Sequence, residues 1–157
     1  MAQKISPFLW FDGNAEEAAH FYVSIFKNSK ITDVVLYTGV EPGPKGTVMT
    51  IAFELDGQKF TGINGGPQFK FTEAVSFAVP CKDQGEIDEM SEKLSAGGEK
   101  GPCGWLKDKF GLSWQVVPEF LMDTLIKGDT AQSARVMAAV MKMSKLDLAT
   151  LKAAAAG

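Results

Sequence analysis

The sequence repeats one order of strand-like and helical patterns, and this repeat restricts the fold more than any other feature. An apolar run at residues 5–11 leads to a polar turn, and Asn14 then precedes a helical pattern over residues 15–26. Strand-like runs follow at residues 31–38, 47–55 and 58–64. The same order starts again at Glu73, where an alternating run leads to Asp83 and a second helical pattern. We expect Asn14 and Asp83 to be N-caps, and the repeated order predicts a duplicated module.

The second half ends in residues 101–118, which have the pattern of a β-hairpin with its turn at Asp108 to Gly111. Alternate residues after the turn point to opposite faces: Leu112, Trp114 and Val116 to one, and Ser113, Gln115 and Val117 to the other. The first set is large and apolar, so we expect it to face helices. The second set should face a partly solvated cup. A strand with these two faces suits a sheet that packs helices on one side and cups a ligand on the other.

We place a first module at residues 1–70, a second module at residues 71–118 and a helical tail at residues 119–157, all within one structural domain. In the tail, Pro118 suits the first position of a helix, Asp129 or Thr130 suits a second N-cap, and Ser144 with Asp147 resembles a third capping box. The final alanine run is expected to fray. Such short helices are stable only when they pack an apolar face. The tail should therefore thicken the helical layer or reach a second copy, and we predict a symmetric homodimer to which it contributes.

The composition excludes several classes of partner. The chain has 157 residues, a formal net charge of −3 and an isoelectric point of about 5.2, so it should attract neither nucleic acid nor an acidic membrane. The two cysteines, Cys81 and Cys103, are too few for a disulfide framework and form no zinc cluster. No apolar run approaches the roughly 20 residues of a membrane span, and the first residues lack the apolar core of a signal peptide. We therefore expect a cytoplasmic protein.

Three segments resemble the vicinal oxygen chelate superfamily, the group of glyoxalases, bleomycin-resistance proteins and extradiol dioxygenases. They run from Pro7 to Phe11, from Phe11 to Tyr22, and from Gly104 to Gln115, where the sequence is Gly-Trp-Leu-Lys-Asp-Lys-Phe-Gly-Leu-Ser-Trp-Gln. The closer likeness is to the PhnB-like branch, often labelled demethylubiquinone methyltransferase-like, and the helical tail also fits. The resemblance implies an α+β fold in which two tandem βαβββ modules form a cupped mixed sheet, with a C-terminal helical tail. It also implies that homodimers are common.

Metal-dependent members of this superfamily place His, Gln or Glu at four strand positions that face the cup. The resemblance puts these positions at Ser6 or Pro7, at Gly62 or Asn64, at Ala74 and at Gln115. Asn64 and Gln115 offer an amide oxygen and neither is charged, so a divalent metal would bind weakly. The chain also lacks a glycine-rich strand-to-helix turn for a nucleotide-derived cofactor. We therefore expect no metal and no cofactor.

Six residues are candidates for binding a small organic molecule in the cup: Gln115, Ser113, Asn64, Phe11, Trp105 and Asp108. The amide of Gln115 could hold a ligand's carbonyl or hydroxyl group, or it could pair with a neighbouring side chain. The aromatic residues could form a binding wall, although core packing is their commoner role. Asp108 suits a turn position better than a general base. The single histidine, His20, lies opposite the apolar stripe of its helix and is expected at the surface.

Three functions are compatible with the sequence. The favoured one is a small-molecule binding protein that works without metal. The second is an enzyme on a small substrate, such as a lyase, an isomerase or a methyltransferase. The third is a structural or interaction module whose cup is filled by its own side chains. A bound ligand would distinguish the first from the third, and turnover would single out the second.

Overall fold

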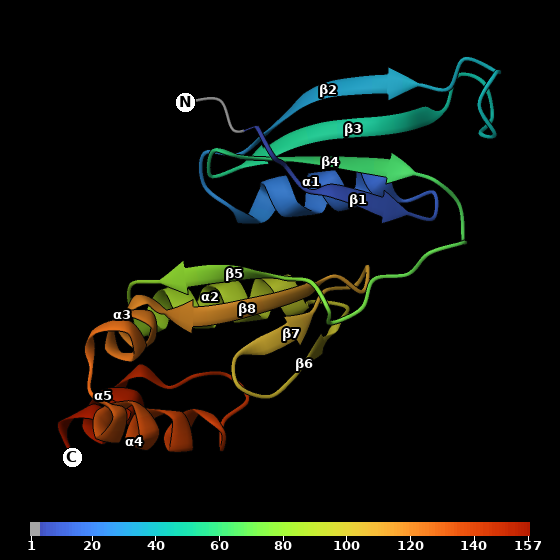
Figure 1. Ribbon diagram of the computed structural model, residues 1–157. Coiled ribbons are helices and arrows are strands. Elements are labelled where there is room, and N and C mark those ends of the chain that lie inside the picture. Colours follow the sequence, from blue (N-terminus) through green and yellow to red (C-terminus); the bar gives the residue numbers. More distant parts are fainter. Residues whose placement is uncertain (1–3) are drawn as a thin grey trace. The chain divides into compact units, whose positions relative to one another are not determined.

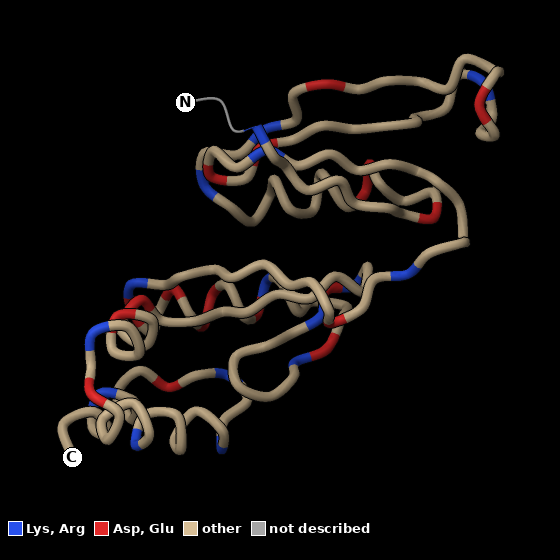
Figure 2. The backbone as a smooth tube through the Cα atoms, in the orientation of Figure 1, with Lys and Arg blue, Asp and Glu red and all other residues tan. Residues whose placement is uncertain are grey.

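The computed structural model describes residues 4–157. The chain divides into two compact units, Met1–Lys70 and Phe71–Gly157. Each unit contains a four-stranded mixed sheet with one helix against it, and the second unit also carries the C-terminal helices (Figure 1). Basic and acidic residues occur in both units (Figure 2). The α+β fold of two βαβββ modules followed by a helical tail is thereby confirmed.

The first unit follows the predicted order of elements. Its elements are β1 (Phe8–Phe11), α1 (Ala15–Ile25), β2 (Lys30–Leu36), β3 (Val48–Leu55) and β4 (Gln58–Asn64). The strands lie in the order β1-β4-β3-β2, with β1 parallel to β4 and the other neighbours antiparallel. The core between α1 and the sheet is formed by Phe11, Ala18, Tyr22, Ile51 and Phe53, all buried. His20 lies on the exposed side of α1, as its helical position predicts.

Asn14 is the N-cap residue of α1, as predicted, but its side chain makes no capping hydrogen bond. Its backbone has φ −116° and ψ 25°, which is not the extended geometry of an ordinary cap. The backbone N–H of Ala15 donates instead to Oδ1 of Asn64 at 2.8 Å. Nδ2 of Asn64 donates to the carbonyl of Val48 at 3.0 Å, so both ends of this amide tie elements of the first unit together.

The second unit repeats the arrangement. Its elements are β5 (Ser76–Cys81), α2 (Gln84–Ser95), β6 (Glu99–Lys100), β7 (Trp105–Lys107) and β8 (Ser113–Pro118). The strands lie in the order β5-β8-β7-β6, with β5 parallel to β8. The Asp83 cap is confirmed, because its Oδ1 accepts the N–H of Glu86 at 2.9 Å. Trp114 and Val116 of β8 are buried with Ile87 and Leu94 of α2, and α2 lies against this sheet in Figure 1.

Residues 119–157 form α3 (Glu119–Lys127), α4 (Thr130–Val140) and α5 (Leu148–Ala156). These helices bury a core of Val117, Leu121, Val136, Val140, Leu146, Leu151 and Ala155. The second-helix cap is confirmed at Asp129, which accepts the N–H of Gln132 at 2.8 Å. Pro118 is the N-cap of α3 and the last residue of β8, rather than the first helical residue.

Two other expectations for the tail are wrong. Asp147 itself caps α5 by accepting the N–H of Thr150 at 3.0 Å, while the hydroxyl of Ser144 bonds elsewhere. The alanine run stays helical to Ala156, because the Arg135 guanidinium donates to the carbonyls of Ala154 and Ala155, each at 3.0 Å. In the described part of the chain, no helix has the length and apolar character that a membrane crossing needs.

Candidate functional site

The second unit contains a hollow of about 510 Å³, within the range of small-molecule sites. It is lined by Glu73, Glu99, Gly101, Pro102, Cys103, Trp105, Leu106, Lys107 and Ser113. Most of this lining is apolar in area, with charged groups from the acidic residues and Lys107. Such a lining suits an organic molecule with a large apolar surface.

The register of β7 and β8 explains how the hollow is built. Lys107 pairs with Ser113 and Trp105 pairs with Gln115 in the antiparallel ladder. Residues that pair directly across a ladder lie on the same face of the sheet. Trp105, Lys107 and Ser113 therefore share the face opposite the buried Trp114, which is the face that the alternation along β8 predicts for Ser113.

An ion-pair group lies in the lining. Nζ of Lys107 is 2.6 Å from Oε1 of Glu73 and 3.9 Å from Oε1 of Glu99. The hydrogen bond from Lys107 holds the pKa of the Glu73 carboxyl below its ordinary value, and the same bond raises the pKa of Lys107. Glu73 and Lys107 are therefore both charged near neutral pH, and the lining contains one more acidic residue than basic residues.

Ser113 is the unusual polar residue of the hollow. Its side chain is 0% exposed, and its Oγ has no hydrogen-bond partner among residues 4–157. A buried hydroxyl without a partner costs about 1–3 kcal/mol of stability. Its opposite neighbour on β5 differs, because the Ser76 hydroxyl accepts a hydrogen bond from Nε2 of Gln115 at 2.9 Å. The lining thus contains an unused donor and acceptor.

The rim of the hollow is a tight turn at residues 101–104, which we call the rim turn. Cys103 has φ +61° and Gly104 has φ +83°, so two successive residues are left-handed. Left-handed backbone is uncommon for residues other than glycine. Sγ of Cys103 lies 3.7 Å from Sδ of Met141 in the tail. Cys103 is half-buried, whereas Cys81 is buried in β5.

Of the six candidate residues, Trp105 and Ser113 belong to the lining of the hollow. Gln115 shares their face but pairs with Ser76. Asp108 is 2% exposed and accepts hydrogen bonds from Phe110, Leu112 and Trp114 in its own hairpin. Phe11 and Asn64 belong to the first unit, where Phe11 is 3% exposed and an added Cβ at Gly62 would lie 3.2 Å from its ring.

Sequence reasoning missed most of the lining, including its charged residues Glu73, Glu99 and Lys107 and the thiol of Cys103. Lys107 could have been predicted, because it lies two residues after Trp105 on a predicted strand and must share its face. Glu73 precedes β5 and Cys103 lies in the rim turn, where no periodicity fixes the direction of a side chain. These two could be found only from the three-dimensional structure.

The residues do not fit a divalent metal. Within residues 4–157, no group of three or more His, Cys, Asp and Glu side chains is placed to hold a metal ion. Both ends of the Asn64 amide already bond to the backbone of Ala15 and Val48. Gln115 offers a neutral amide, which is a weak ligand by itself. These positions therefore lack the charged ligands that would hold a divalent metal firmly.

The fold places the chain in a broad structural class. Two βαβββ units, each with its first strand parallel to its last, are the arrangement of the vicinal oxygen chelate superfamily of glyoxalases, bleomycin-resistance proteins and dioxygenases. A fosfomycin resistance protein, FosX, of Listeria monocytogenes has this fold, with 18% identity and a TM-score of 0.56 over 80% of this chain and 98% of that one. Protein PA1353 of Pseudomonas aeruginosa is similar at 21% identity, with a TM-score of 0.61 over 75% and 98% of the two chains.

The family is more specific. Residues 3–117 match the family described as 3-demethylubiquinone-9 3-methyltransferase, and the chain belongs to this PhnB-like family. A PhnB protein of Bacillus cereus, described in the same terms, is 40% identical over 74% of this chain and 99% of that one, with a TM-score of 0.66. The comparison with curated proteins gave no match. The family match ends one residue before Pro118, so it does not include the helical tail.

The family description implies a methyl donor, and the residues do not fit one of the nucleotide-derived kind. Such cofactors are held where a glycine-rich turn joins a strand to a helix. Here β1 leads to α1 through Asp12, Gly13 and Asn14, and β5 leads to α2 through Lys82 and Asp83. Neither junction has the glycine pattern that lets the backbone approach a phosphate closely.

Proposed function

We propose that the protein binds a small, largely apolar organic molecule in the hollow of the second unit. The observation that carries the proposal is the hydroxyl of Ser113, which is buried in the lining without a partner. Burying an unpaired hydroxyl is unfavourable. A ligand that carries one hydrogen-bonding group, such as a hydroxyl or a carbonyl, would satisfy it.

The charges of the lining restrict the ligand further. Glu73 and Glu99 share the single cation of Lys107. An anionic ligand would therefore be repelled by the excess of acidic groups in the lining. A neutral or cationic ligand meets no such repulsion. Trp105 supplies a flat aromatic surface that suits stacking with a ring or with a cation. The proposed ligand class is therefore a neutral or cationic aromatic molecule with one polar group.

Contact with the hydroxyl requires a small movement, because Ser113 is 0% exposed. Its partner in the ladder, Lys107, lies on the same face and is 38% exposed in its side chain. Ion pairs at this exposure contribute little to stability. A ligand that displaces the Lys107 side chain to reach Ser113 would therefore lose little free energy from the broken ion pair.

We also propose that the protein is a homodimer. The edge strand β2 exposes about half of Val34, Val35 and Leu36. The tail packs its core within the second unit, so its contribution to an interface would come from the outer residues Met122 and Ile126 of α3. Exposed apolar groups gathered on one edge or helix favour association.

Native mass spectrometry of freshly purified protein tests both proposals together. We expect a dimer, and on each chain an organic adduct of a few hundred daltons that disappears under denaturing conditions. The variant Ser113→Leu, which extends an apolar side chain into the hollow, should lose the adduct and keep the dimer. An adduct of the same mass on the Ser113→Leu variant would place the ligand elsewhere. Wild-type protein that is monomeric at micromolar concentration would rule out the homodimer.

A further inference from the structure

We infer that the tail segment at residues 143–146 supports the rim of the hollow, and that Gln84 is the positioning residue that keeps this segment, and through it the rim turn, in place. The inference rests on the proposed binding function of the hollow. Residues 143–146 lie beyond the family match, which ends at residue 117, whereas Gln84 and the rim turn lie within it. We call residues 143–146 the strap.

The strap holds the rim turn through its backbone. The N–H of Cys103 donates to the carbonyl of Met143 at 2.8 Å, and the N–H of Gly104 donates to the carbonyl of Ser144 at 2.7 Å. Oγ of Ser144 donates back to the carbonyl of Gly101 at 2.7 Å. These bonds join a segment of the tail to the turn that supplies Gly101, Pro102 and Cys103 to the lining.

The rim turn needs this support because its conformation is unfavourable by itself. Cys103 has φ +61°, a left-handed conformation that side-chain-bearing residues rarely adopt. At Gly104 an added Cβ would lie 2.7 Å from the carbonyl oxygen of Val116 and 3.1 Å from the side chain of Leu146. The turn is therefore pressed between β8 and the strap, and it would relax if the strap moved away.

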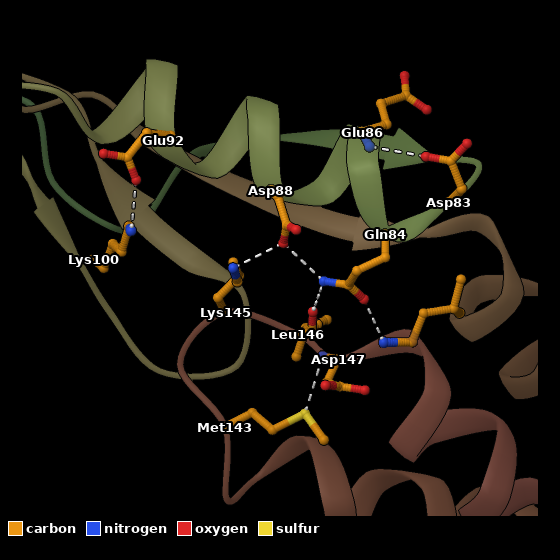
Figure 3. Close-up of polar contacts among 11 residues, drawn as sticks. Asp83, Gln84, Glu86, Asp88, Glu92, Lys100, Met143, Lys145, Leu146 and Asp147 are labelled. Atoms are coloured by element: carbon orange, nitrogen blue, oxygen red, sulfur yellow. Dashed lines mark hydrogen bonds and ion pairs between the residues drawn. The ribbon is translucent and has the colours of Figure 1, made fainter.

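Gln84, at the start of α2, fixes the strap from the other side (Figure 3). Its Nε2 donates to the carbonyl of Leu146 at 3.1 Å, and its Oε1 accepts the N–H of Leu148 at 2.7 Å. The amide thus bonds to the chain on both sides of Asp147, as a neighbouring strand would. Asp88, one turn further along α2, accepts from the same Nε2 at 2.9 Å and pairs with Lys145 at 2.8 Å.

A chain of contacts therefore runs from α2 through the strap to the rim of the hollow. Gln84 is not in the lining, so its effect on a ligand would pass through the geometry of the rim turn. Loosening the strap should free the backbone of Cys103 and move its thiol away from Met141. The reactivity of the Cys103 thiol then reports the state of the rim without any ligand.

The test measures the rate at which Ellman's reagent modifies Cys103 in the full-length protein. Cys81 is 0% exposed and should not contribute in the folded state. The variant Gln84→Ala should raise the rate about five- to tenfold, as expected when two hydrogen bonds that hold a segment are lost. The matched control is Gln132→Ala, because Gln132 also donates to a tail carbonyl, that of Ala155 at 3.2 Å, but does not touch the strap. Its rate should equal that of the wild type.

A second variant tests the strap itself and covers the case in which Gln84→Ala fails to fold. Ser144→Ala removes one bond to the rim turn from an exposed side chain, and should raise the rate about threefold. An unchanged rate in Ser144→Ala, or equal rates in Gln84→Ala and Gln132→Ala, would overturn the inference. The rate is measured without ligand. If the hollow binds nothing, the proposed function is refuted, but the rates still show whether Gln84 and the strap hold the rim turn.

Discussion

Ser76 and Ser113 lie directly opposite each other in the parallel pair of β5 and β8, yet their hydroxyls differ in hydrogen bonding. Ser76 accepts from Gln115 at 2.9 Å, whereas Ser113 has no partner within residues 4–157. The two residues have the same chemistry and share one face of the sheet. The Ser76 hydroxyl is therefore used by the fold, whereas the Ser113 hydroxyl is left for a ligand.

Replacing these serines should have opposite effects on stability. Ser113→Ala removes a buried unpaired hydroxyl and should raise the free energy of unfolding by about 1 kcal/mol. Ser76→Ala leaves the Gln115 amide without its partner and should lower it by about 1 kcal/mol. Urea unfolding of both variants measures this. Equal destabilisation by the two changes would mean that Ser113 has a partner in the folded protein.

Asp108 should be a stability residue rather than a ligand-binding one. Its Oδ2 accepts from Nε1 of Trp114 at 2.8 Å, and its Oδ1 accepts from the N–H groups of Phe110 and Leu112 at 2.9 and 3.1 Å. In Asp108→Asn the new NH2 group would face one of the N–H groups that now donate to the carboxylate. This clash should lower the free energy of unfolding by about 2 kcal/mol. Adding Trp114→Phe removes the opposing indole N–H, so the two changes together should cost less than their sum in a double-mutant cycle. If the costs of the two substitutions simply add, the hydrogen bond between Asp108 and the Trp114 indole contributes nothing to stability.

The two thiols should differ in reactivity. Burial raises the pKa of the Cys81 thiol to about 12, with further contributions from Glu86, Asp83 and Glu119. Thiol titration at pH 8 should therefore find one reactive cysteine in the folded protein and two in urea, and Cys103→Ser should show none when folded.

Because the pKa of Cys81 is higher in the folded state, its contribution to stability is complete below its ordinary value of 9.0 and is lost as the pH rises toward 12.

The ion pair of the lining should be visible by NMR titration of the Glu73 carboxyl. Its pKa is lowered by the hydrogen bond from Lys107, so the charged pair is complete above the ordinary value of 4.5 and is lost as the pH falls through the lowered value. In Lys107→Met the midpoint of Glu73 should move up toward its ordinary value. An unmoved midpoint would show that another group holds the pKa of Glu73 low.

Much of the fold was predictable because the signals are local. The alternation along β8 and the helical periodicities of α1 and α2 depend only on neighbouring residues. The position of the N-cap of α1 at Asn14 was predictable, but the hydrogen bond that replaces its side-chain cap was not, since the oxygen that accepts from Ala15 comes from Asn64, distant in sequence. The same holds for Ser144, whose hydroxyl bonds to Gly101 instead of capping its own helix.

The site was less predictable than the fold. Ser113 and Trp105 followed from strand alternation, but the placement of Phe11 depended on a one-residue register that an apolar run such as Phe8–Phe11 does not fix. The hydrogen bonds that occupy Asp108 and Asn64 form only when distant segments pack. Glu73 and Cys103 reach the hollow from segments without periodicity.

The most direct test of the account is the affinity of the hollow for two matched molecules, 2-naphthol and 2-methylnaphthalene, followed through tryptophan fluorescence. They have nearly the same size, and only the naphthol can hydrogen-bond with Ser113. Wild-type protein should bind the naphthol about tenfold more tightly, which corresponds to one satisfied buried hydroxyl. Ser113→Ala should bind the two equally. Failure of wild-type protein to bind either molecule, or a tenfold preference that survives in Ser113→Ala, would contradict the account.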